Sequence, residues 1–118
     1  MGNFQYLPSL LLLLLFASCR SSPGFDFGAY SEAEEFYERG EYRKAIEKYE
    51  EYVRENPEGN MAAIADYYRA KSYENLGEVD KARELYAKVV KNHPAVIWAN
   101  FSKTRLEELQ SQSTPQGT

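Results

Sequence analysis

Hydrophobic residues divide the chain into two parts. The first part contains an unbroken apolar run from Leu10 to Ala17, and the second part, which begins near Asp26, spaces its apolar residues as amphipathic helices do. In this second part small and aromatic residues recur four positions apart, as Ala45 and Tyr49 do, so that they share one face of a helix. The pattern predicts an all-α domain behind a short apolar leader.

The helical part repeats itself after 37 residues: "RGEYRKAIEKYEEYVRENP", residues 39–57, aligns with "LGEVDKARELYAKVVKNHP", residues 76–94. In each copy a glycine closes one helix and a proline ends the next, so each copy predicts a pair of antiparallel helices. Ala45 and Ala82 are predicted to let the paired helices approach closely, with Tyr49 and Tyr86 filling the space beyond. Such a period is typical of an array whose units bury their apolar faces against each other.

These features resemble the tetratricopeptide repeat (TPR). The matching positions are Ala33, Phe36, Gly40, Tyr42, Ala45, Tyr49 and Pro57 in the first unit, and Ala70, Tyr73, Gly77, Val79, Ala82, Tyr86 and Pro94 in the second. The period exceeds the usual TPR length of about 34 residues, and the extra residues are placed near "EGNMA", at the joint between the units. Longer units of this kind are similar to those of two bacterial envelope families, the periplasmic cell-division coordinator of the Tol-Pal system and the lipoprotein of the outer-membrane β-barrel assembly machine.

The residues after Pro94 predict one more helix, with apolar positions at Ile97, Trp98, Phe101 and Leu109. No second helix follows it, so it is interpreted as the cap of the last repeat, and Trp98 as core, with a ligand anchor as the alternative. The predicted fold is an all-α solenoid of antiparallel helical hairpins. The predicted TPR domain covers residues 26–110, with repeats at 26–57 and 63–94, a capping helix at 95–110, and a flexible tail at 111–118.

The leader predicts a lipid anchor. Its apolar run is shorter than the roughly 20 residues that cross a bilayer, but it has the length of a signal-peptide core. "FASC", residues 16–19, resembles the lipobox of bacterial lipoproteins, in which a cysteine is acylated, and Cys19 is the single cysteine of the chain. The resemblance implies a signal peptide at 1–18, and an acylated Cys19 with a short tether at 19–25. Cleavage by the ordinary signal peptidase near "FAS", or a poor membrane anchor, is the alternative.

The charge pattern argues against nucleic acid as the main partner, because the net charge is −4 and no basic stripe is visible. The acids concentrate in the first repeat, where residues 26–58 hold 11 acidic and 5 basic residues, against 7 and 8 in residues 59–118. This acidic end is interpreted as a solvated face or, alternatively, as a preference for a basic partner. Helical spacing predicts the exposed ion pairs Glu35–Arg39, Glu50–Arg54 and Glu84–Lys88.

No residue pattern indicates an enzyme. The sequence contains no glycine-rich phosphate loop and no nucleophile with a recognisable base. The single histidine, His93, is interpreted as a helix cap, and with no cysteine after Cys19 the sequence predicts no metal site and no cofactor.

The TPR resemblance implies that the first helix of each unit lines a concave face that binds a polypeptide. By the family pattern, the groove-facing positions are Tyr30, Glu34, Tyr37, Glu38, Tyr67, Lys71, Glu74 and Asn75. For Tyr67 the alternative is packing against the following "NFSKTR" helix.

These features together predict a non-enzymatic protein-interaction module of the bacterial cell envelope. It is expected to be lipid-anchored on the periplasmic side of the outer membrane, as a scaffold or adaptor with a protein or peptide partner in an assembly or division complex. The alternative is a structural TPR protein, secreted or soluble, that forms homo-oligomers and has no foreign peptide ligand.

Overall fold

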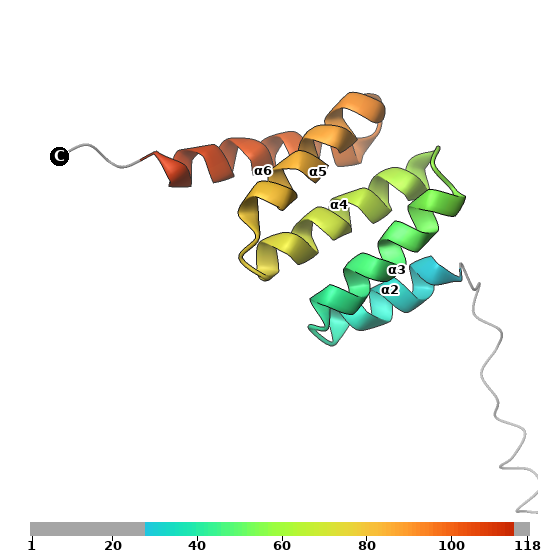
Figure 1. Ribbon diagram of the computed structural model, residues 1–118. Helices are drawn as coiled ribbons and strands as arrows, with labels where there is room; N and C mark the ends of the chain where they lie inside the picture. Colours follow the sequence, from blue (N-terminus) through green and yellow to red (C-terminus); the bar gives the residue numbers. More distant parts are fainter. Residues whose placement is uncertain (1–27, 115–118) are drawn as a thin grey trace, which may run out of the picture.

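The computed structural model describes residues 28–114, and every regular element in this range is a helix. The helices are α2 (Ala29–Glu38), α3 (Tyr42–Glu55), α4 (Asn60–Asn75), α5 (Val79–Asn92) and α6 (Ile97–Ser113) (Figure 1). The predicted all-α array is confirmed for these residues, whereas the predicted signal peptide, Cys19 and the tether lie outside them. Within 28–114, no helix combines the length and apolar character that a bilayer span requires.

Two glycines close the first helix of each hairpin. Gly40 and Gly77 have φ values of 75° and 77°, a left-handed conformation that few other residues adopt. The backbone N–H of Glu41 donates to the carbonyl of Phe36, and the preceding Gly40 N–H donates to Tyr37, at 2.9 and 3.0 Å. The same two bonds recur 37 residues later, so both turns are Schellman motifs with one geometry.

Each hairpin is held together at the predicted contact positions. Ala45 and Ala82 are fully buried, and so are Tyr49 and Tyr86. The buried residues form two clusters: Tyr30, Ala33, Ala45, Tyr49, Val53 and Ala65 in the first, and Ala70, Ala82, Tyr86 and Leu109 in the second. The first cluster joins α2 and α3 to α4, and the second joins α4 and α5 to α6, so each hairpin is completed by the helix that follows it.

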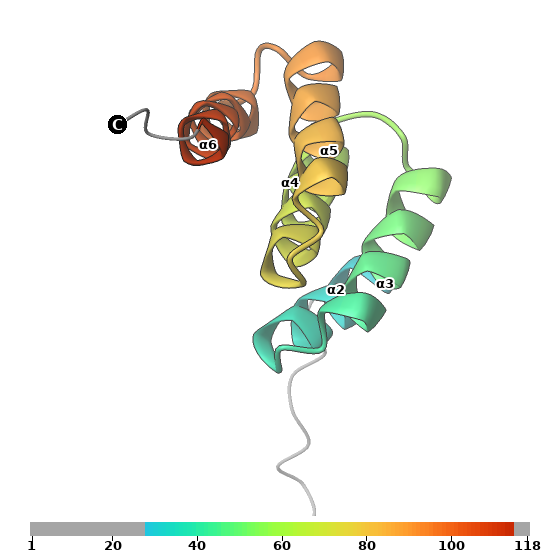
Figure 2. The ribbon, with the colours of Figure 1, turned by 60° about the vertical axis from the view of Figure 1, so that its left-hand side comes forward.

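The helix α6 takes the place of the first helix of a third unit. Figures 1 and 2 show the α2–α3 and α4–α5 hairpins in succession, with α6 beyond α4–α5 on the side away from α2–α3. The 37-residue offset continues into α6, because Ala99 and Ser102 are buried as Ala62 and Ala65 are. Where α4 has the buried Ala70, however, α6 has the exposed Glu107. At this position α6 is therefore polar, as a capping helix requires, although Ile97 and Phe101 of the same helix are 60% and 46% exposed.

Two boundaries differ from those predicted from the sequence. The first helix of the second unit begins at Asn60, whereas the predicted repeat begins at residue 63, so part of the joint "EGNMA" is helical. The last helix extends to Ser113 rather than to residue 110. The hydroxyls of Ser111 and Ser113 donate to the backbone carbonyls three residues before them, which satisfies acceptors in the final turn.

Candidate functional site

The predicted groove residues of α2 border a hollow. Glu34 and Glu38 lie exposed on α2, one helical turn apart, and Tyr37 beside them is half-buried. With Tyr49 of α3 and Tyr68 of α4, these residues line a cavity of about 180 Å³. We call this cavity the α2–α4 hollow; its walls come from three helices of both repeats.

Three tyrosine rings form the apolar wall of the α2–α4 hollow. The ring centroid of Tyr68 lies 5.3 Å from that of Tyr37, edge-on, and 6.2 Å from that of Tyr49, nearly parallel. Burial raises the pKa of both Tyr37 and Tyr49 above the ordinary tyrosine value. Their hydroxyls are therefore neutral at pH 7, and each can donate or accept a hydrogen bond.

The structure corrects the prediction for Tyr30, which is 6% exposed and belongs to the core. The rings of Tyr49 and Tyr52, both on α3, enclose its ring at centroid distances of 5.7 and 5.5 Å. The Tyr30 hydroxyl donates a hydrogen bond to the carboxylate of Glu34. Tyr30 therefore positions Glu34 and offers little surface of its own to a ligand.

Two of the four predicted groove residues of α4, Tyr67 and Glu74, lie against α6. The ring centroid of Tyr67 is 5.1 Å from that of Trp98 and 6.3 Å from that of Phe101. This is the packing alternative for Tyr67, and it gives Trp98 a structural role at the same joint. The ammonium of Lys71 lies 5.9 Å from the centroid of the Tyr67 ring, and the Asn75 amide donates to the Lys71 carbonyl at 2.9 Å.

Glu74 fastens α6 to the second hairpin. Its carboxylate accepts a hydrogen bond from the Tyr86 hydroxyl at 2.9 Å, and from Nε of Arg105 on α6 at 2.9 Å. The Arg105 guanidinium also forms an ion pair with Glu74 and with Glu108. The hydrogen bond from Arg105 is the main reason that the pKa of Glu74 lies below its usual value. Of the eight predicted groove residues, three line the α2–α4 hollow and two contact α6. Tyr30 lies in the core, and the contacts of Lys71 and Asn75 within α4 join neither residue to α6.

We expect Glu74→Gln to lower the free energy of unfolding at pH 7 by about 1.5–3 kcal/mol, because hydrogen bonds to charged groups contribute in this range. Since the folded-state pKa is depressed, this stabilisation is complete above the unfolded-state pKa of about 4.3 and is lost as the pH falls through the folded-state value. Urea unfolding at several pH values should show the gap between parent and variant closing in acid. A gap that stays constant down to pH ~3 would contradict the assignment. Glu107→Gln, which removes an exposed carboxylate of α6, is the control.

Sequence reasoning missed Tyr49 and Tyr68 as walls of the α2–α4 hollow. Tyr49 matches a core position of the family, and its ring is 1% exposed. The residue equivalent to Tyr68 in the first unit is Ser31, so the repeat pattern gives no signal for an aromatic there. A hollow between two units depends on how the second hairpin sits on the first, and this is a property of the assembled array.

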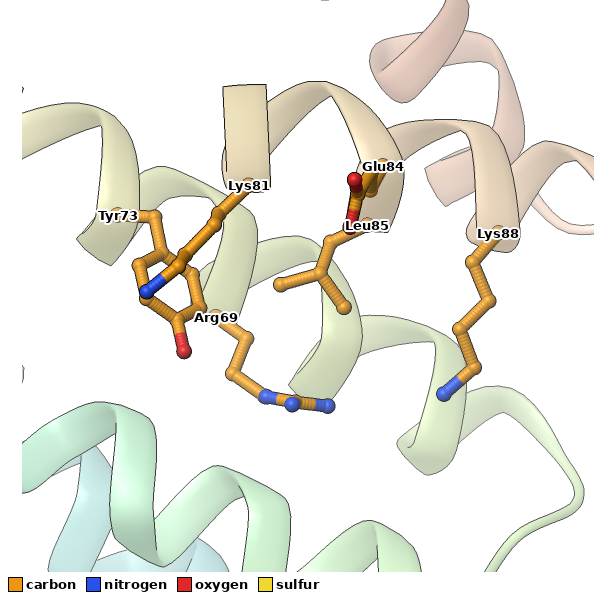
Figure 3. Close-up of a pocket in the computed structure, with 6 residues that line it drawn as sticks. All are labelled: Arg69, Tyr73, Lys81, Glu84, Leu85 and Lys88. Carbon is orange, nitrogen blue, oxygen red and sulfur yellow. The ribbon is translucent and has the colours of Figure 1, made fainter. Parts of the chain in front are cut away.

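A second cavity, of about 300 Å³, lies between α4 and α5. Figure 3 shows its lining residues, Arg69, Tyr73, Lys81, Glu84, Leu85 and Lys88. Arg69 and Lys88 both bind the buried carboxylate of Asp66, at 3.0 and 2.9 Å. Arg69 also lies 3.6 Å from Glu50 of α3. Arg69 and Lys88 are therefore already neutralised within the chain, and the cavity lies within the second hairpin.

Within residues 28–114, no group of histidine, cysteine or carboxylate side chains could hold a metal ion.

A family model described as the tetratricopeptide repeat matches residues 30–97, which is more than half of the chain. Comparisons with curated proteins and with solved structures gave no match. Repeats of this kind generally mediate protein–protein interaction. The chain belongs to the tetratricopeptide repeat family.

Proposed function

We propose that the chain is a non-enzymatic adaptor that binds a polypeptide at the α2–α4 hollow. The observation that carries this proposal is the hollow itself, where the half-buried ring of Tyr37 and the exposed carboxylates of Glu34 and Glu38 meet at the junction of the repeats. Tyrosine supplies rigid contact area together with a polar tip, which suits it to polypeptide interfaces. Tyr67 and Glu74 of α4 contact α6 instead, and they are not part of the proposed site.

A photo-crosslinking amino acid at position 38 tests this proposal. Glu38 is exposed beside the hollow, whereas Glu47 is exposed on α3 and takes no part in its lining. After irradiation of cells that carry the full chain, we expect mass spectrometry to find crosslinks to a partner protein from position 38 and none from position 47. Equal crosslinking from both positions would contradict the proposed site. Crosslinks from position 38 to a second copy of the chain would instead support the self-associating alternative.

We further propose that Cys19 is acylated and tethers the adaptor to the bacterial envelope, on the periplasmic side of the outer membrane. The support comes from the sequence: an apolar run, a small-residue cluster and then the only cysteine. Each buried CH₂ of an acyl chain contributes about 0.8 kcal/mol, so two or three chains hold a protein on a membrane. An adaptor in an envelope assembly or division complex would benefit from such a tether, because it restricts the search for a partner to the membrane surface.

Mass spectrometry of the native protein tests the lipid anchor. We expect the mature chain to begin at Cys19 and to carry acyl chains there. Cys19→Ala is expected to leave the signal peptide uncleaved by the lipoprotein pathway. A native chain that retains Met1, or that begins with an unmodified residue near Cys19, would contradict the anchor but not the adaptor role.

A further inference from the structure

We propose that the α2–α4 hollow receives an arginine side chain from a basic segment of the partner polypeptide. This inference rests on the proposed adaptor function and specifies the chemistry of its ligand. It combines three features of the hollow: the pairing of the carboxylates on α2, the aromatic wall, and the size of the cavity.

The four glutamates of α2 fall into two pairs with different surroundings. Glu32 binds Lys48 of α3 at 3.0 Å, and Glu35 lies 3.6 Å from Arg39. Glu34 and Glu38, the two that line the hollow, form no ion pair with any residue in the range 28–114. Like charges spaced four residues apart destabilise a helix. Repulsion between Glu34 and Glu38 therefore destabilises α2 at the hollow, and a bound cation would remove this repulsion.

One lysine on each of α3 and α4 is engaged by other groups. On α3, Lys48 bridges Glu32 and Glu51, at 3.0 and 3.1 Å. On α4, the ammonium of Lys71 lies over the Tyr67 ring. The excess of acids over bases in residues 26–58 extends the negative charge beyond the hollow. A partner segment of positive charge is therefore complementary to this end of the array.

The aromatic wall and the size of the hollow favour a guanidinium group. Tyr37 and Tyr68 present ring surfaces beside the carboxylates, and a planar guanidinium can stack on such a ring while its N–H groups bind a carboxylate in pairs. An ammonium is more strongly hydrated and lacks this planar fork. The volume of about 180 Å³ admits a side chain with a few waters. Pockets for drug-sized ligands measure about 300–1,000 Å³, so a small-molecule cofactor fits less well.

Fluorescence anisotropy with defined peptides tests the inference on the full chain in a non-ionic detergent at low salt. The probe is a fluorescein-labelled dodecapeptide made of four Gly-Ser-Arg units, and its matched control carries citrulline, which is neutral, in place of each arginine. We expect the citrulline peptide to bind at least about 10-fold more weakly, because each charge-assisted hydrogen bond lost costs about this factor. We expect a lysine version of the peptide to bind more weakly than the arginine version.

Two double variants with the same change of net charge locate the site. Glu34→Gln with Glu38→Gln removes both carboxylates of the hollow but keeps an oxygen that can accept the Tyr30 hydrogen bond. Glu47→Gln with Glu55→Gln removes two exposed carboxylates of α3 that line no part of the hollow. We expect the first variant to bind the arginine peptide about 10-fold more weakly and the second to stay within about 2-fold of the parent.

The inference is overturned if both double variants weaken binding equally, because the peptide then senses only the overall charge. It is also overturned if the citrulline and arginine peptides bind alike, a comparison that needs no variant. If position 38 crosslinks a partner while the arginine peptide does not bind, the adaptor site stands and the arginine chemistry is wrong. If position 38 and position 47 crosslink alike, the adaptor site itself is wrong.

Discussion

Tyr86→Ala is expected to lower the free energy of unfolding by about 3–5 kcal/mol, the usual cost of truncating a buried aromatic residue. Tyr86 is fully buried on α5, its ring centroid lies 5.7 Å from that of Tyr67, and its hydroxyl donates to Glu74 at 2.9 Å. The change therefore leaves a cavity in the second hairpin and also weakens the attachment of α6. Against a total stability of about 5–15 kcal/mol for a typical domain, this loss is large.

Urea unfolding followed by circular dichroism measures this loss, with Tyr86→Phe as the matched control. The phenylalanine keeps the ring and removes only the hydrogen bond to Glu74, so we expect a loss of about 1 kcal/mol. If Tyr86→Ala costs no more than Tyr86→Phe, the ring is not a core residue of the second hairpin. The loss in Tyr86→Phe measures the hydrogen bond to Glu74, which binds α6. The additional loss in Tyr86→Ala measures the packing of the ring within the second hairpin.

The features predicted correctly from the sequence are those that the repeat itself encodes. The left-handed conformation of Gly40 and Gly77 follows from the absence of a side chain, and the burial of Ala45 and Ala82 follows from the spacing of small residues on one helix face. Such features need only neighbouring residues and the period of the array. They could be predicted without knowing how one hairpin sits on the next.

Ion pairs show where this local reasoning ends. The predicted pair Glu35–Arg39 is confirmed at 3.6 Å, and both residues lie on α2 or its end. Glu50, however, lies 3.6 Å from Arg69 on α4 rather than pairing within α3. Lys88 likewise binds Asp66 of α4, at 2.9 Å, instead of Glu84. Where helices pack together, an oppositely charged residue on the neighbouring helix competes with the one a turn away on the same helix. The spacing of charges along one helix cannot predict which of these two ion pairs forms.

The candidate site was only half predictable for the same reason. Glu34, Tyr37 and Glu38 lie at the hollow, as the family pattern implies for the first helix. Tyr67 and Glu74 occupy the equivalent face of α4, but α6 lies against them through Trp98 and Arg105. The sequence offered packing against this helix as the alternative for Tyr67, but the repeat pattern did not identify Arg105 as the partner of Glu74.

Ala82→Leu is expected to lower the free energy of unfolding by about 1–3 kcal/mol, because overpacking a close contact forces side chains or helices apart. Ala82 is fully buried and clusters with Ala70 of the facing helix and with Leu109 of α6. A larger side chain at this point has no space to enter without separating α4 from α5. Thermal and urea unfolding of the full chain measure the effect.

Ala87→Leu provides the matched control, since it makes the same substitution on the same helix at an exposed position. We expect this variant to stay within about 0.5 kcal/mol of the parent, as surface substitutions usually do. The contrast between the two variants therefore isolates the contact between α4 and α5 from any change in helix propensity. If Ala82→Leu matches the parent, Ala82 is not a close contact between α4 and α5, and the 37-residue register that predicts this contact is wrong.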